Sequence, residues 1–324
     1  MSDESLLLKA CYQHYRRGLS QTEIAANLRL SRFQVARMLR AGLEEGYVTV
    51  KILEPARWHP ELERAIEERY GLNAVIVVDN DGLDDEEVRL RVADAAGRYL
   101  IDLLEDGDVL GVSLGSSVQA LIDQLPDRIS KEVEVVQLIG GSSRVESELN
   151  SMILAAQLAR RFGSRSHLLF APALVSHGDL RESLLADGTV EATFAMFGRL
   201  TVAVLGIGAF AQGGTSRLVH DRIVDDALFP KLLARGAVGD VLSYVYRADG
   251  TVLAGGVEDR LIAISLDEVL RVPHRIAVAA GRAKARAIAG ALRGGFVNVL
   301  VTDSEAAAAI CAETEDAGAA NVAG

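Results

Sequence analysis

Apolar side chains recur every three to four positions in three successive segments near the start of the chain, and this spacing predicts three helices. The segments cover residues 4–17, about 21–28 and 32–45. Apolar and polar positions then alternate over residues 47–53, which indicates a strand. Three helices with a short middle one, followed by a strand, are typical of a winged helix-turn-helix, whose third helix can enter the major groove of DNA.

Two of these predicted helices begin at residues that favour helix starts. Ser20 and Glu23 have the spacing of a capping box, and Ser31 can cap the third helix. Val35 and Leu39 then face the interior, while the basic residues fall largely on the other side. The alternative is a three-helix packing module with a solvated basic face. We expect DNA contacts from six residues: Tyr15, Gln21, Ser31, Arg32, Gln34 and Arg37.

A segment with two prolines, residues 54–60, interrupts the periodic patterns and is the candidate linker. We therefore expect a DNA-binding domain over residues 1–53 and a second domain over residues 61–324. In the second domain, continuous apolar runs alternate with helical segments, which indicates an α/β fold with a mostly parallel sheet buried on both faces. An exception is residues 241–253, where Asp249-Gly250 between two strand-like runs predicts a hairpin.

The elements expected in the second domain follow from these runs. The strands are residues 74–78, 109–113, 133–139, 168–171, 201–205, 276–279 and 297–301. The helices are residues 60–70, 85–104, 117–125, 147–162, 283–293 and 304–312.

Several of these strands end next to residues that suit a phosphorylated ligand. Ligands of open α/β sheets bind at the carboxyl ends of strands, beside helix N-termini. Glycine N–H groups, serine hydroxyls and a lysine can bind phosphate, and an aspartate can accept a sugar hydroxyl. The alternatives are an ordinary Gly/Ser turn, a solvated lysine and a turn-forming aspartate. The candidates are Gly115, Ser116, Ser117, Gly140, Gly141, Asp240 and Lys284.

We expect neither a cofactor nor a metal. Gly206-x-Gly208-x-x-Ala211 partly fits a dinucleotide fingerprint, but the acids about twenty residues on, Asp225 and Asp226, lie in a helical pattern rather than at a second strand end. The six histidines show no ligand spacing with cysteines or acids.

The charge of the chain is divided unevenly. Overall it is −11, with 49% hydrophobic residues, so a largely disordered chain is excluded. Residues 1–53 contain eight Lys or Arg and five Asp or Glu, a net charge of +3, which leaves −14 on the rest. A basic head on an acidic body favours DNA contact confined to the head.

The same composition suggests where the protein works. No apolar run reaches the roughly 18–20 residues of a membrane span, and the N-terminal residues lack a secretory signal pattern. The two cysteines, Cys11 and Cys311, form no plausible disulfide framework. We therefore expect a cytoplasmic protein with no membrane partner.

The sequence resembles the SorC-type sugar-binding transcriptional regulators. The resemblance runs from about Leu6 to Ala312 and rests on the order and spacing of several blocks rather than on any single one. The blocks include Gly18-Leu-Ser-Gln-Thr-Glu-Ile-Ala, Gly111-Val-Ser-Leu-Gly-Ser-Ser, Ala171-Pro-Ala, Gly236-Ala-Val-Gly-Asp240 and Val297-Asn-Val-Leu-Val-Thr-Asp303. The chain departs from many relatives at Leu114, where they have Trp, and at Ser304, where they have Glu.

The resemblance implies a Rossmann-like sheet of the phosphosugar isomerase and deaminase type, reused as a sensor. It implies that Ser116, Ser117 and Lys284 bind the phosphate of a sugar or polyol effector. By the same resemblance, Asp240 binds a sugar hydroxyl, and Gly140, Gly141 and Ala173 line the pocket. It further implies a homodimer or homotetramer whose affinity for operator DNA changes when the effector binds.

The resemblance leaves a second function open, which is an enzyme with a DNA-binding head. A phosphosugar isomerase or deaminase needs a carboxylate or histidine base within about 3 Å of the proton that moves. The sequence shows no clear pair of this kind, although Asp240 and His177 are candidates.

Overall fold

The computed structural model describes residues 3–48, 59–141, 151–211, 216, 218, 228–255 and 257–313. The chain divides into two units, residues 1–56 and 57–324. Most of the predicted linker and residues 49–53 of the predicted wing strand lie outside the described residues.

The N-terminal unit has its helices where the sequence predicts them. They are α1 (Asp3–Cys11), continued by a π-helix (Tyr12–Arg16), then α2 (Gln21–Leu28) and α3 (Arg32–Glu44). Capping boxes start α2 and α3, because the side chains of Ser20 and Ser31 each accept a hydrogen bond from the backbone three residues on. Their core consists of Leu7, Ala10, Cys11, Ile24, Ala25, Val35 and Leu39.

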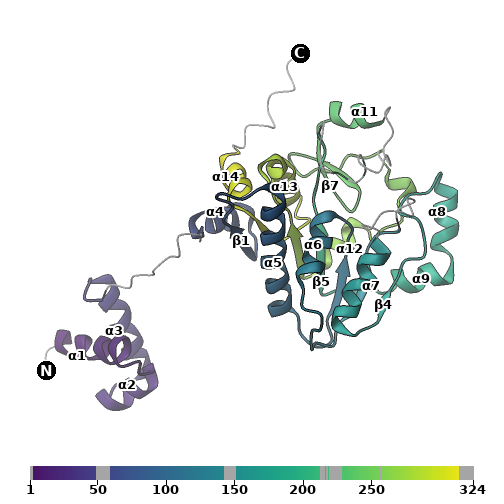
Figure 1. Cartoon of the computed structure of the whole chain (residues 1–324). Helices are drawn as coiled ribbons and strands as arrows, with labels where there is room; N and C mark the ends of the chain where they lie inside the picture. The colour runs from purple at the N-terminus through teal and green to yellow at the C-terminus, as the bar shows by residue number, and fades with distance from the viewer. Residues whose placement is uncertain are drawn as a thin grey trace. The chain divides into compact units, whose positions relative to one another are not determined.

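A seven-stranded sheet forms the centre of the second unit, in the order β1-β10-β9-β5-β2-β3-β4 (Figure 1). All of its pairings are parallel, which confirms the predicted parallel sheet. The strands are β1 (Ala74–Val78), β2 (Val109–Val112), β3 (Glu134–Gln137), β4 (Ser166–His167), β5 (Val202–Gly206), β9 (His274–Val278) and β10 (Val299–Asp303).

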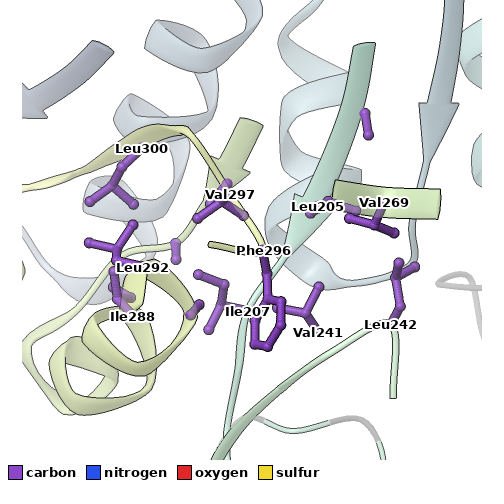
Figure 2. Packing of buried hydrophobic residues seen from close by; sticks show 14 of the residues in the cluster. Leu205, Ile207, Val241, Leu242, Val269, Ile288, Leu292, Phe296, Val297 and Leu300 are labelled. Carbon is purple, nitrogen blue, oxygen red and sulfur yellow. The ribbon is translucent and has the colours of Figure 1, made fainter. Parts of the chain in front are cut away.

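Helices pack on both faces of this sheet, which is why the central strands have continuous apolar runs instead of alternation. One apolar cluster contains α5 (Asp85–Leu103), α6 (Ser116–Gln124) and α7 (Ser151–Phe162). The other contains α4 (Pro60–Tyr70), α13 (Ala285–Arg293) and α14 (Ser304–Ala312). Figure 2 shows the second cluster, where Ile288 and Leu292 of α13 pack near Phe296 and Val297.

A small antiparallel sheet follows β5. It consists of β6 (Gly208–Ala209), β7 (Ala237–Val241) and β8 (Tyr244–Arg247). Asp249-Gly250 makes the predicted turn, because the segment after it pairs back on β8 at Tyr246 and Val252. A second reversal at Leu242-Ser243, between β7 and β8, has no signal in the sequence.

The structure differs from the predicted elements in a few places. The strand expected at residues 168–171 is wrong, since β4 ends at His167. Residues 147–150 of the predicted helix lie outside the described residues. Short elements that the periodicity does not predict are α8 (Gly178–Leu185), α9 (Gly188–Phe194), α11 (Leu228–Ala234), α12 (Leu266–Arg271) and the 3-10 turns Phe197–Arg199, Glu258–Arg260 and Arg282–Lys284. None of the helices in the described ranges has the length and apolarity to cross a membrane.

Candidate effector pocket and DNA-binding surface

The order in which the chain adds parallel strands to the sheet reverses between two neighbouring strands, β2 and β5. From β2 the chain continues to β3 and β4 at one edge, and β5 then returns to the other side of β2. The loops that follow β2 and β5 therefore diverge and leave a crevice at the carboxyl ends of the strands.

A pocket occupies this crevice. Five of the predicted effector residues meet in it: Gly115, Ser116, Ser117, Asp240 and Lys284. The remaining lining residues are Ser113, Leu114, Gly206, Ile207, Gly208, Leu242 and Ser243.

The loop after β2 gives this pocket a helix N-terminus. Gly115 precedes α6 with φ of +137°, a conformation that favours glycine, and no side chain caps the helix. Ser116 is exposed and Ser117 is buried beside it in the first turn. Ser113 holds the loop against the next strand, because its Oγ accepts a hydrogen bond from the Gly206 N–H at 3.1 Å. Uncapped N–H groups next to two hydroxyls form a site suited to a phosphate.

Lys284 brings a positive charge to the same pocket. Its Nζ donates a 3.1 Å hydrogen bond to the carbonyl oxygen of Ile207 in the loop after β5. Burial lowers the pKa of the Lys284 ammonium, and the nearby Asp240 carboxylate opposes this effect.

Asp240, on β7, is the buried carboxylate of the pocket. Its residue surface is 7% exposed, and its Oδ1 makes no hydrogen bond of good geometry to any described residue. Burial raises the pKa of Asp240 to about 6. The Ser216 side chain, the Ser243 backbone and the charge of Lys284 lower this pKa, but by less than burial raises it. A buried polar atom without a partner is costly, so Oδ1 is well suited to accept a hydrogen bond from a ligand hydroxyl.

Two backbone features place this carboxylate. A Cβ at Gly208 would lie 2.3 Å from the Asp240 Oδ1, so only glycine leaves room for the carboxylate. Leu242 and Ser243 have φ of 51° and 69°, which makes the β7–β8 turn one that ordinarily contains Asn or Gly. This strained turn lies in the pocket lining and positions the Ser243 N–H near Asp240.

The other three predicted effector residues lie in a separate set of backbone contacts. The Gly141 N–H bonds the Ala171 carbonyl, and the Ala173 N–H bonds the Gly141 carbonyl, both at 2.8 Å. A Cβ at Gly140 would lie 2.5 Å from the backbone of Pro172, so this glycine allows two segments to approach closely. Gly140, Gly141 and Ala173 are not among the described lining residues of the pocket, and their contact with an effector stays a prediction.

Sequence reasoning missed Arg89. It lies on α5, where it pairs with Glu86, and its Nη1 donates a 3.1 Å hydrogen bond to the carbonyl oxygen of Ser116. It also lowers the pKa of Lys284. Nothing in the helical pattern of α5 distinguishes Arg89 from the other charged residues on that helix, so no sequence signal indicated its place beside the pocket.

The predicted DNA-contacting residues lie on the surface of the N-terminal unit. Arg32 and Arg37 on α3 are exposed, Tyr15 is 40% exposed and Gln21 is partly buried. Ser31 and Gln34 are also exposed, but they serve the helix cap as well. Ser31 N–H donates to the Gln34 Oε1 at 2.8 Å, and the Gln34 N–H donates to the Ser31 Oγ at 3.2 Å.

Similar proteins place the chain in a family. The family model described as "Putative sugar-binding domain" matches residues 57–312. The Sorbitol operon regulator of Klebsiella pneumoniae is 31% identical over 310 residues, which are 94% of this chain and 97% of that protein. The crystal structure of the full-length Sorbitol Operon Regulator SorC from the same organism superposes with a TM-score of 0.74 at 29% identity, covering 96% of this chain and 99% of that one.

The chain belongs to the SorC family of sugar-binding transcriptional regulators. Another relative is the Transcriptional regulator LsrR of Escherichia coli (strain K12), 29% identical over 312 residues, with 96% of this chain and 95% of that protein covered. The resemblance stated from the sequence is thereby confirmed.

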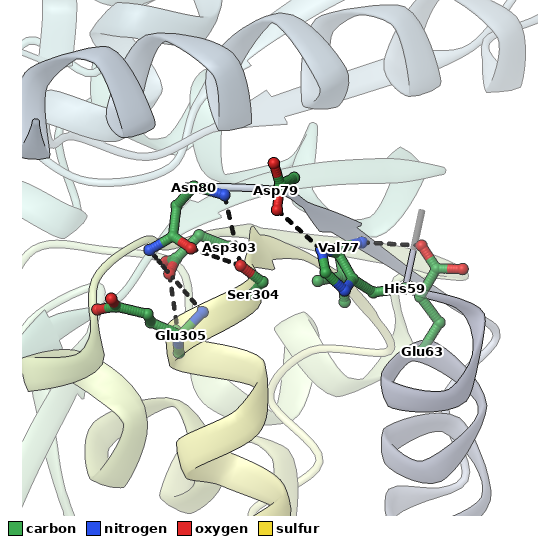
Figure 3. Close-up of polar contacts among 9 residues, drawn as sticks. His59, Glu63, Val77, Asp79, Asn80, Asp303, Ser304 and Glu305 are labelled. Carbon is green, nitrogen blue, oxygen red and sulfur yellow. Dashed lines mark hydrogen bonds and ion pairs between the residues drawn. The ribbon is translucent and has the colours of Figure 1, made fainter. Parts of the chain in front are cut away.

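The two positions at which this SorC-family protein departs from many relatives lie in different surroundings. Leu114 is part of the lining. Ser304 donates a 2.5 Å hydrogen bond to the Asn80 side chain at the start of α14 (Figure 3). Next to it, Asp303 caps α14 and accepts a 2.5 Å hydrogen bond from the Gly281 N–H. Because Gly281 begins the turn that ends at Lys284, Asp303 helps to fix the lysine.

The two residues proposed for catalysis in the enzyme alternative, His177 and Asp240, do not share the described pocket lining. His177 is exposed and caps α8, where its Nδ1 accepts a 3.3 Å hydrogen bond from the Leu180 N–H. It is not among the described residues that line the pocket, and Asp240 is the single carboxylate in that lining. Gly206 ends β5 and Gly208 begins strand β6, so these glycines do not open the helix that a dinucleotide fingerprint requires. No cluster of three or more potential metal ligands occurs in the described part of the chain.

Proposed function

We propose that this SorC-family protein is a DNA-binding transcriptional regulator of carbohydrate metabolism, controlled by a phosphorylated sugar or polyol. The pocket carries the proposal, because it combines three features that such a ligand needs. An uncapped helix start with two serines suits the phosphate, and Lys284 adds a positive charge. The Oδ1 of Asp240, which has no hydrogen bond of good geometry among the described residues, suits a hydroxyl. The names of the sorbitol, LsrR and deoxyribonucleoside regulators support the regulatory role.

In the proposed complex, the phosphate lies at the start of α6. The N–H groups of the first turn and the hydroxyls of Ser116 and Ser117 donate to its oxygens, and Lys284 neutralises part of its charge. The carbon chain then extends towards Asp240, whose Oδ1 accepts a hydrogen bond from one hydroxyl. Gly115 provides the open backbone for the phosphate, and Gly140, Gly141 and Ala173 are proposed to contact the ligand from further out.

On the DNA side, the first turns of α3 enter the major groove. Arg32, Gln34 and Arg37 contact bases or phosphates there, with Ser31, Gln21 and Tyr15 nearer the backbone. The protein acts in the cytoplasm as a homodimer or homotetramer, in which two copies of α3 lie about 34 Å apart, one turn of DNA. The effector changes operator affinity only by binding two arrangements of the oligomer with different affinities.

A thermal-shift screen of sugar and polyol phosphates against the full chain tests the effector half of the proposal. A true effector at 100 times its Kd should stabilise the protein by about 2.7 kcal/mol, and the shift at the same concentration should be markedly smaller in Lys284→Ala. Footprinting of DNA upstream of the protein's own gene, with and without the effector, tests the DNA half. Absence of any protected site at low salt contradicts it.

Asp240 supports one second candidate, an isomerase or deaminase. A carboxyl group with a pKa of about 6 suits a general base. Against this, no histidine and no second carboxylate occurs among the described residues of the lining, so Lys284 is the one side chain there that could serve Asp240 as an acid partner. We therefore propose a sensor without enzymatic activity. Turnover of ribose or aminosugar phosphates that is lost in Asp240→Asn would contradict this.

A further inference from the structure

Phe33 departs from the amphipathic pattern of its helix. It is the second residue of α3 and is 89% exposed, the highest value among the large hydrophobic residues of the described chain that lie at the surface. Val35 and Leu39 of the same helix are buried in the core of the unit, to which Phe33 contributes nothing. Its role must therefore come from something outside this core.

The surroundings of Phe33 are basic. Residues four and seven positions further on share its face of the helix, and these are Arg37 and Arg40, both exposed. Arg32, also exposed, precedes it. The capping box between Ser31 and the helix fixes the first turn, so the aromatic ring projects from a rigid position. One apolar group at the N-terminal end of a basic helix face is poorly suited to an apolar protein surface, because the arginines would lose their hydration there.

This combination matches the major groove of DNA. The groove walls are phosphates, which suit the arginines, and the base edges on its floor carry one apolar group, the C5-methyl of thymine. We propose that Phe33 contacts a thymine methyl group in each operator half-site and so determines base preference at that position. The inference rests on the proposed function that α3 binds operator DNA.

Selection from a random pool of DNA duplexes, with the full-length wild type and with Phe33→Ala, tests the inference. The wild type is expected to select a motif with a thymine at one position, and Phe33→Ala to lose that preference while the other positions persist. Deoxyuridine, which lacks only the methyl group, is then placed at that position. It should weaken wild-type binding about fourfold, the equivalent of about one buried methyl group, and should leave Phe33→Ala unchanged.

Two controls separate this contact from a general defect. Leu43, near the end of α3, is 43% exposed, and Leu43→Ala should keep the penalty for deoxyuridine. The melting temperature of Phe33→Ala should equal that of the wild type, because an exposed ring stabilises little.

Three results would overturn the inference. Phe33→Ala could select the same motif with the same deoxyuridine penalty, in which case another residue contacts the methyl. It could change the mass of the oligomer in sedimentation instead of the base preference, which would make Phe33 a contact between protein subunits. If the wild type selects no motif at all, the proposed DNA-binding function fails, and the inference fails with it.

Discussion

The pocket and the DNA-binding unit are assembled over very different distances in the sequence. The candidate DNA contacts lie within residues 15–37, and all except Tyr15 lie on or at the start of two neighbouring helices, α2 and α3, that begin at local caps. The pocket draws on the loops after β2 and β5, the β7–β8 turn and the turn before α13, within residues 113–284. A local surface can tolerate changes elsewhere, whereas the pocket depends on the packing of the whole sheet. Substitutions in the two regions should therefore differ in whether their effects stay local or extend to the packing of the sheet.

Loss of the pocket lysine should have the largest effect. Lys284→Ala removes a charged donor to the phosphate and should weaken effector binding about 10- to 150-fold, or about 1.5–3 kcal/mol. Isothermal titration calorimetry measures the change. Arg282→Ala is the matched control, because Arg282 is exposed in the same turn and outside the lining. Equal losses in the two variants would argue against a specific contact of Lys284.

The buried carboxylate should make stability depend on pH. Folding raises the pKa of Asp240 from 3.8 to about 6, so the folded state binds more protons than the unfolded state between these values. The wild type should therefore lose stability relative to Asp240→Asn as the pH rises from about 4 to about 6, by at most about 3 kcal/mol. Urea unfolding at a series of pH values measures this. A constant difference between the two proteins would show that Asp240 is not desolvated.

A methyl group at Gly208 should disturb the pocket through packing. Gly208→Ala places a Cβ against Asp240 and should cost about 1–3 kcal/mol of stability, together with effector affinity. Gly198→Ala is the control, since no atom lies within 4 Å of its Cβ position. Thermal unfolding and effector titration distinguish the two, and a stable, fully binding Gly208→Ala would contradict the described position of Asp240.

On the DNA side, Arg37→Ala should weaken DNA binding by about 1–2 kcal/mol if it removes a phosphate contact, and lower the slope of log K against log salt by about 1. Effector affinity should not change, because α3 contributes nothing to the pocket lining. Arg286→Ala, an exposed arginine on α13, is the control. Fluorescence anisotropy over a range of salt concentrations gives both quantities.

Removal of a helix cap should have the smallest effect. Ser20→Ala loses the hydrogen bond that the Glu23 N–H donates to the Ser20 Oγ, and should destabilise α2 by about 1 kcal/mol. Hydrogen exchange of the α2 amides measures the loss. Faster exchange in the second unit as well would contradict the local character of the N-terminal unit.

The two regions also differ in how well the sequence predicts them, because one is assembled from nearby residues and the other from distant ones. The helices of the N-terminal unit are predictable because their caps and apolar spacing are local, as at Ser20, Ser31 and Val35. The parallel strands are also predictable, from runs such as residues 74–78 that are apolar throughout. The short helices α8 and α9 are not, because α8 buries none of its residues and α9 only Val190 and Thr193, too few for a helical apolar period.

In the pocket, residues next to a strand end could be named from the sequence, as with Ser116 and Lys284. Arg89 and Ser113 could not, because their hydrogen bonds to Ser116 and Gly206 appear only when separate segments meet. The turn at Leu242-Ser243 was missed for a related reason. Its residues have no intrinsic preference for a positive φ, and the surrounding structure imposes it.

The central claim is that the effector pocket and the DNA-binding unit are coupled, and reciprocal titration tests this most directly. The Kd of a selected operator duplex is measured with and without the sugar phosphate found in the screen, and the Kd of that sugar phosphate is measured with and without the duplex. Linkage requires the two Kd values to change by the same factor, about 5- to 150-fold for a typical coupling. Lys284→Ala should need a higher concentration of the sugar phosphate to produce the same change in the operator Kd. A sugar phosphate that binds the pocket tightly and leaves the operator Kd unchanged would contradict the account.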